Sequence, residues 1–104
     1  MKRTILLTAL AVAAVATASA TDAKENWEKH CKNCHGLDGK GDTKMGKKYQ
    51  VKDYTSAAVQ TKLKDAAITK AIKEGEKPKM KAFGEVLSDD EIKALVKYIR
   101  AFKK

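Results

Sequence analysis

The sequence predicts an all-α fold for this chain of 104 residues. No stretch alternates between apolar and polar residues as a half-buried β-strand does, whereas several segments repeat apolar residues every three or four positions. Helix start and stop signals flank these segments, and no internal repeat or linker divides them. We therefore expect four or so helices in one small domain, joined by irregular loops.

The first 20 residues have the pattern of a cleaved signal peptide. Lys2 and Arg3 form a positive start, residues 5–15 form an apolar run, and Ala18-Ser19-Ala20 offers the small residues that a signal peptidase accepts. A membrane-spanning helix needs about 20 apolar residues, so we expect no stable membrane insertion. The alternative is an uncleaved N-terminal helix. We expect cleavage after Ala20, export to a bacterial periplasm and one mature domain over residues 21–104.

The charge balance is strongly basic, with 22 Lys and Arg against 13 Asp and Glu and a net charge of +9. The lysines are spread along the chain and interleaved with acids, which is not the block of a nucleic-acid-binding tail. A distributed positive surface suits acidic protein partners, or only solubility. A mature domain of 84 residues is marginal on a protein core alone, so a disulfide, metal or cofactor is expected to reinforce it.

The first helix is expected over residues 22–34. Ala23, Trp27 and Cys31 recur at four-residue spacing on one face, and Gly36 follows as a stop signal. Residues 36–54 are expected to form a loop, because they include four glycines and many lysines. A loop this long in so small a domain needs something to wrap around.

Two shorter helices are expected next. Thr55 or Ser56 could cap the first of them, whose apolar residues are Ala58, Val59 and Leu63. Asp65 is expected to cap the second, and Gly75 fits the position just after its end. The apolar stripe of this second helix consists of Ala67, Ile68, Ala71 and Ile72.

The last helix has the clearest signals in the sequence. Ser88 and Glu91 have the spacing of a capping box, and the residues near the start are acidic while those near the end are basic. Its apolar face is formed by Ile92, Leu95, Val96, Ile99 and Phe102, with Tyr98 beside it.

The segment HCKNCHG, residues 30–36, contains both cysteines and both histidines of the chain. A redox dithiol of the thioredoxin kind would follow a strand, and no strand is expected here. A plain disulfide is the usual state of two cysteines in an oxidising compartment. A zinc site would need four ligands aimed at one centre from six residues, mostly on one helix. All three alternatives fit less well than a covalently attached haem.

Covalent haem attachment uses every part of the C-x-x-C-H signature. Cys31 and Cys34 lie one helical turn apart, so both sulfurs can bond the vinyl groups on one edge of the porphyrin. His35 then places an imidazole under the iron as an axial ligand. His30 is expected to point elsewhere on the helix, as a partly exposed surface residue.

With this motif, the chain resembles the small class I c-type cytochromes over essentially the whole of residues 21–104. The resemblance implies one covalently bound haem c in a crevice, and an all-α fold in which the first and last helices cross. That crossing would pair Trp27 with Leu95 and Tyr98. The motifs that carry the resemblance are W-x-x-x-C-x-x-C-H-G at 27–36, AITKAIKEG at 67–75, MKAFG at 80–84 and LSDDEIKALVKYIR at 87–100.

The resemblance also implies that Met80 is the second axial ligand, because the family places a methionine far downstream of its C-x-x-C-H. A thioether is a soft donor, and Met/His ligation raises the reduction potential. Met45 is the competitor, since it also lies in a predicted loop. The chain departs from the family at Lys81, where a proline often follows the ligand, and in the loop after the motif, which lacks the proline whose carbonyl orients the haem histidine. Tyr49, Lys52 and Tyr54 are candidate donors to the haem propionates.

The function implied is that of a soluble periplasmic one-electron carrier cycling between Fe(III) and Fe(II), and not an enzyme. Its expected partners are redox proteins with acidic docking surfaces, namely a membrane-bound reductase as donor and an oxidase or other protein as acceptor. We expect a monomer that binds no nucleic acid. The alternative is a gas or ligand sensor or a small haem enzyme, which needs an exchangeable sixth ligand. Candidate docking lysines are Lys32, Lys77, Lys79 and Lys81.

Overall fold

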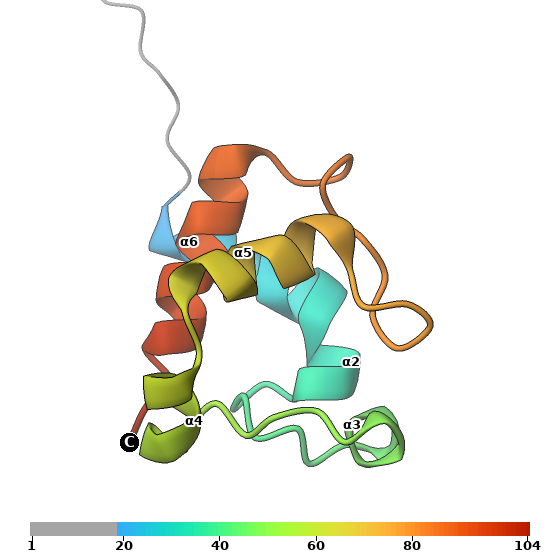
Figure 1. Ribbon diagram of the computed structural model, residues 1–104. Coiled ribbons are helices and arrows are strands. Elements are labelled where there is room, and N and C mark those ends of the chain that lie inside the picture. Colours follow the sequence, from blue (N-terminus) through green and yellow to red (C-terminus); the bar gives the residue numbers. More distant parts are fainter. Residues whose placement is uncertain (1–18) are drawn as a thin grey trace, which may run out of the picture.

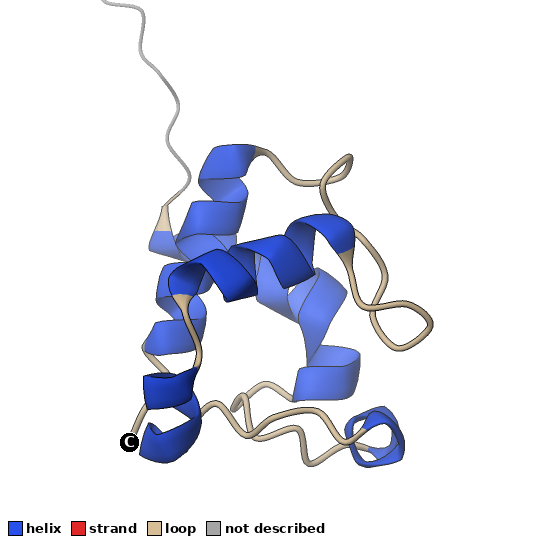
Figure 2. Cartoon of the chain, in the orientation of Figure 1, coloured by secondary structure: helices blue, strands red, loops and turns tan. Residues whose placement is uncertain are grey.

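The computed structural model describes residues 19–104, which form helices joined by loops, without a β-strand (Figures 1 and 2). Most of the predicted signal peptide, residues 1–18, lies outside the described residues. Among the described helices, none is both long and apolar enough to cross a membrane. In chain order the elements are α1 (Ala20–Asn26), the π-helical turn η1 (Trp27–Cys31), α2 (Lys32–His35), α3 (Lys44–Tyr49), α4 (Ala57–Lys62), α5 (Asp65–Glu74) and α6 (Asp89–Arg100).

The first three elements follow one another without a break, so the predicted first helix is confirmed. Ser19 caps it at the start through a capping box with Asp22. Gly36 ends it with a φ of 78°, which favours glycine. The π-helical turn was not predicted: the Lys32 N–H donates to the Trp27 carbonyl five residues back, which shifts the register of the side chains between them.

The prediction of a loop over residues 36–54 is wrong in part, because residues 44–49 form α3. Thr43 begins this helix. Its hydroxyl accepts a hydrogen bond from the Gly46 N–H at 2.8 Å and donates to the Cys34 carbonyl at 2.7 Å. The same side chain therefore caps α3 and fastens it to the end of α2.

The start of α4 agrees with the prediction, whereas the start of α5 does not. Of the two predicted caps of α4, Ser56 is the one that the structure uses. Asp65 does not cap α5: it is the first residue of that helix, and its carboxylate pairs with Arg100 at 2.9 Å instead. On α4 the buried side chain is Gln60, whereas the apolar Val59 and Leu63 are half-buried and Ala58 is exposed. Gly75 ends α5 as predicted.

The last helix begins at the predicted capping box of Ser88 and Glu91. It contacts α1, and Figure 1 shows the two crossing. Trp27 lies at this crossing in one core cluster with Leu95, and its ring centroid lies 5.7 Å from that of Tyr98. The predicted crossing is thereby confirmed. The buried core consists of Trp27, Ile68, Ile72, Phe83, Leu87, Ile92, Leu95, Val96 and Ile99.

The contact between α3 and α2 can be tested with a substitution at Gly46 that helix propensity favours and close packing disfavours. Alanine is favoured over glycine in a helix by about 1 kcal/mol. A Cβ at Gly46, however, would lie 2.3 Å from the carbonyl oxygens of Cys34 and Gly41. We expect Gly46→Ala to lower the free energy of unfolding by about 1–3 kcal/mol, measured by denaturant titration.

Lys47→Ala on the same helix is the matched control. Lys47 is exposed and, among residues 19–104, forms an ion pair with exposed Asp42, so its loss should change the free energy of unfolding by about 0.5 kcal/mol or less. A Gly46→Ala variant more stable than the wild type would show that α3 does not pack against α2 as described.

Candidate functional site

A cavity of about 590 Å³ lies between the first helix, α5 and the loop that follows α5. This volume is within the range of sites that hold a small molecule or cofactor. Cys31, Cys34 and His35 line it from the N-terminal part of the domain, and Met80 lines it from a segment much later in the chain. The structure therefore brings the four predicted site residues to one cavity. Apolar residues of α5 and α6 complete the wall: Ala67, Ile68, Ala71, Ile72, Leu95 and Ile99.

The two cysteines are half-buried and unpaired in the described structure. Burial, followed by the neighbouring Cys34, raises the pKa of the Cys31 thiol to about 12. A reactive redox dithiol needs the opposite shift, because the thiolate is its nucleophile. The environment of Cys31 thus suits a sulfur that is held in a covalent bond rather than one that exchanges disulfides.

His35 lies between two aromatic rings. Its ring centroid is 5.6 Å from that of Trp27 and 5.4 Å from that of Tyr54, and the Tyr54 ring is stacked on it at 24°. Burial lowers the pKa of His35, so the imidazole is neutral at pH 7, which is the form that binds a metal. Its Nδ1 atom is buried and has no hydrogen-bond partner among the described residues. A half-buried, neutral imidazole whose Nδ1 atom has no partner among the described residues fits the role of a haem-iron ligand.

Met80 is held by a closed turn. Its N–H donates to the Glu76 carbonyl and its carbonyl accepts from the Glu76 N–H, both at 2.8 Å. Gly75 precedes this turn with a φ of 71°, and a Cβ there would lie 2.6 Å from the Met80 carbonyl oxygen. Met45, the competing methionine, lies on α3 and is not among the residues that line the cavity.

The position of His30 differs from the prediction. It is partly exposed as predicted, but instead of pointing elsewhere it lines the cavity, and its ring centroid lies 5.3 Å from that of Phe83. Burial lowers its pKa, with smaller effects from the positive charges of Lys29 and Lys81. His30 lies within the π-helical turn, whose shifted register an ordinary helical projection does not anticipate.

The three candidate propionate donors, Tyr49, Lys52 and Tyr54, all line the cavity. Burial is the main cause that raises the pKa of Tyr54 to about 12, so its hydroxyl stays a hydrogen-bond donor across the physiological pH range. Of the four candidate docking lysines, Lys79 and Lys81 line the cavity, whereas Lys32 and Lys77 do not.

Sequence reasoning missed two polar residues that bear on the site. Glu76 lines the cavity, and its charge opposes the ionisation of Tyr54 and favours protonation of His35. Gln60 is buried behind Tyr54 and donates to its carbonyl. Neither position has a local sequence signal. The missed helix α3 does have one, because the spacing Thr43-x-x-Gly46 is that of a helix cap.

Comparison with known proteins agrees with this arrangement. A family model described as "Cytochrome C oxidase, cbb3-type, subunit III" matches residues 18–99. The solved structure of the KustC0563 c-type cytochrome is 38% identical, with a TM-score of 0.76, over 80% of this chain and 99% of that one. A structure of a tyrosine-to-phenylalanine mutant of Kustc0563 is also 38% identical, with a TM-score of 0.73, over 79% and 99%. No curated protein matches the chain.

The family model covers most of the chain and includes the whole cavity lining. The structural match covers nearly the full length of the similar cytochrome, so the likeness concerns the entire fold rather than the C-x-x-C-H segment alone. The chain therefore belongs to the family of the cbb3-type cytochrome c oxidase subunit III and is a small c-type cytochrome with one covalently bound haem c.

Proposed function

We propose that this cytochrome is a soluble periplasmic one-electron carrier rather than an enzyme. The observation that carries the proposal is the cavity in which Cys31, Cys34 and His35 stand on one wall and Met80 on another. Two thiols for covalent attachment, a neutral imidazole and a thioether are the donors that a His/Met-ligated haem c requires.

In this proposal Cys31 and Cys34 hold the haem by thioether bonds, and His35 and Met80 are the axial ligands. The bound haem supplies one iron that passes between Fe(III) and Fe(II). The chain keeps the ligand positions fixed: the rings beside His35 restrict its movement, and the closed turn fixes the backbone of Met80. Two firmly held ligands leave no coordination position for a substrate, which favours electron transfer over catalysis.

The positive N-terminal segment with its short apolar run supports export, and we propose that the signal peptide of residues 1–20 is removed in the periplasm. We propose a monomer whose partners are redox proteins with acidic docking surfaces: a membrane-bound reductase as donor, and an oxidase or other protein as acceptor. The exposed Lys79 and Lys81 at the cavity support this choice, because charges at a rim mainly raise the rate of association.

The ligand assignment predicts the optical spectrum. The ferric wild-type protein should show the weak far-red band of sulfur-to-iron charge transfer, and the reduced protein should resist carbon monoxide because Met80 fills the sixth position. Met80→Ala should abolish the band and bind carbon monoxide at once. Met45→Ala is the matched control and should behave as the wild type. A wild-type protein that lacks the band and binds carbon monoxide would favour the sensor or enzyme alternative.

The docking face is tested with two small oxidants of opposite charge. At low salt, Lys79→Glu should slow oxidation by hexacyanoferrate(III), an anion, by about threefold or more, and should speed oxidation by tris(phenanthroline)cobalt(III), a cation. The visible spectrum should not change, and high salt should remove both effects.

Lys93→Glu makes the same charge change on α6, outside the cavity lining, and should alter both rates much less. Equal effects of the two substitutions would show that net charge, and not a docking face at the cavity, governs the rates.

A further inference from the structure

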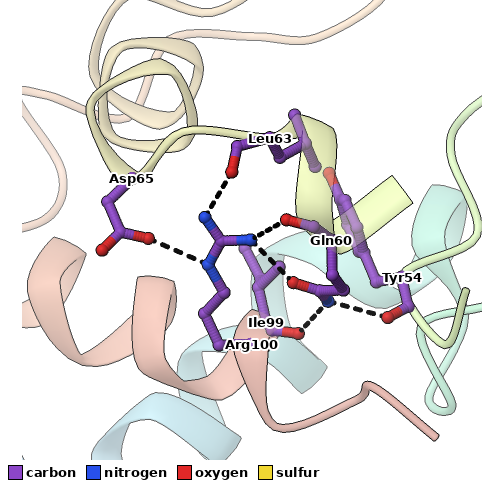
Figure 3. A network of polar contacts seen from close by, with 6 residues as sticks. All are labelled: Tyr54, Gln60, Leu63, Asp65, Ile99 and Arg100. Atoms are coloured by element: carbon purple, nitrogen blue, oxygen red, sulfur yellow. Dashed lines mark hydrogen bonds and ion pairs between the residues drawn. The ribbon is translucent and has the colours of Figure 1, made fainter. Parts of the chain in front are cut away.

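Gln60 is the one polar residue that is buried among residues 19–104, at 6% exposed. Its amide makes three hydrogen bonds, drawn in Figure 3. The Nε2 atom donates to the carbonyls of Tyr54 at 2.7 Å and Ile99 at 2.9 Å, and the Oε1 atom accepts from Arg100 at 2.9 Å. A buried amide with this many partners ties together segments that are far apart in the sequence.

Arg100 determines the orientation of that amide. Its guanidinium donates to the backbone carbonyls of Gln60 and Leu63 and to the Asp65 carboxylate, as well as to Gln60 Oε1. Because Arg100 has no acceptor, the atom that faces it must be the amide oxygen of Gln60. The Nε2 side is therefore turned towards Tyr54.

Tyr54 is held at both ends of its backbone. Its N–H donates to the Gly39 carbonyl at 2.9 Å, and its carbonyl accepts from Gln60. The Lys104 N–H also donates to the carbonyl of the next residue, Thr55, at 3.1 Å. With the backbone fixed in this way, the Tyr54 ring is stacked on His35 at 24°.

We propose that Gln60 and Arg100 are positioning residues for the axial histidine, which act through Tyr54 to set the plane of the His35 imidazole. The inference rests on the proposed role of His35 as an iron ligand. A ligating histidine is ordinarily oriented by a hydrogen bond from its other ring nitrogen. Here Nδ1 has no such partner among the described residues, and aromatic rings lie against the imidazole instead.

The test measures the proton NMR spectrum of the ferric holoprotein, in which the hyperfine shifts of the haem methyl groups depend on the plane of the axial imidazole. Gln60→Leu removes every amide hydrogen bond at similar volume and should change the pattern of these shifts. Tyr54→Leu, which removes the stacked ring, should change it in the same way. Tyr54→Phe keeps the ring and should retain the wild-type pattern.

Ser88→Ala controls for stability, because it destabilises α6 at its capping box without a contact to Tyr54 or His35, and its methyl pattern should be that of the wild type. Arg100→Lys removes the planar guanidinium but keeps the charge, so it should give a smaller change of the haem-methyl pattern in the same direction. This variant keeps the test possible if Gln60→Leu does not fold. A wild-type pattern in Tyr54→Leu or Arg100→Lys, or a Tyr54→Phe change as large as that of Tyr54→Leu, would overturn the proposal. If hyperfine-shifted His35 resonances are missing from the wild type, the ligand assignment itself fails.

Discussion

The burial of Trp27 is the constraint on which both the core and the site depend. Its side chain is 1% exposed and lies near Tyr98 and Phe102 at the helix crossing, and near Tyr54 and His35 towards the cavity. Its indole N–H donates a buried hydrogen bond of 2.9 Å to the Gly36 carbonyl, directly after His35. One side chain therefore packs the first helix against α6 and fixes the backbone that carries the histidine.

The two walls of the cavity are both set by close contacts between backbones. At one wall, α3 approaches the Cys34 carbonyl so closely that only glycine fits at position 46. At the other, the backbone of Gly75 contacts that of Met80 and the following residues. Such contacts leave little room for the walls to shift, which suits ligands that must keep their geometry while the iron changes its charge.

The sequence was sufficient at several places where the signal is local. Ser88 and Glu91 predicted the start of α6, and the spacing of Cys31, Cys34 and His35 predicted their place on one cavity wall. The sequence was insufficient where partners far along the chain determine the role of a side chain. Asp65 has the chemistry of a helix cap, but Arg100, 35 residues later, binds its carboxylate. Gln60 looks like a surface residue, and only the carbonyls around it explain its burial.

The error at His30 has a physical cause of a different kind. A π-helical turn adds a residue to one turn of the helix, so a projection at 3.6 residues per turn misplaces the side chains in it. The turn ends at Cys31, the first residue of the attachment motif, so the register changes where the motif begins. The helix thereby buries Trp27 on its core side while it still presents Cys31, Cys34 and His35 to the cavity.

The site also explains how so short a chain holds together. Its cavity walls come from the first helix, from α5 and from the turn at Met80, and these segments surround the cavity rather than fill it. A group that contacts this arrangement and not the unfolded chain stabilises the fold. A covalently attached haem stays on the chain in both states, so its contribution comes from the contacts that only the folded cavity makes. In the proposed ligation, Met80 lies 45 residues after His35, so it can reach the iron only when the fold is complete, and the same bonds would both stabilise the domain and define its redox site.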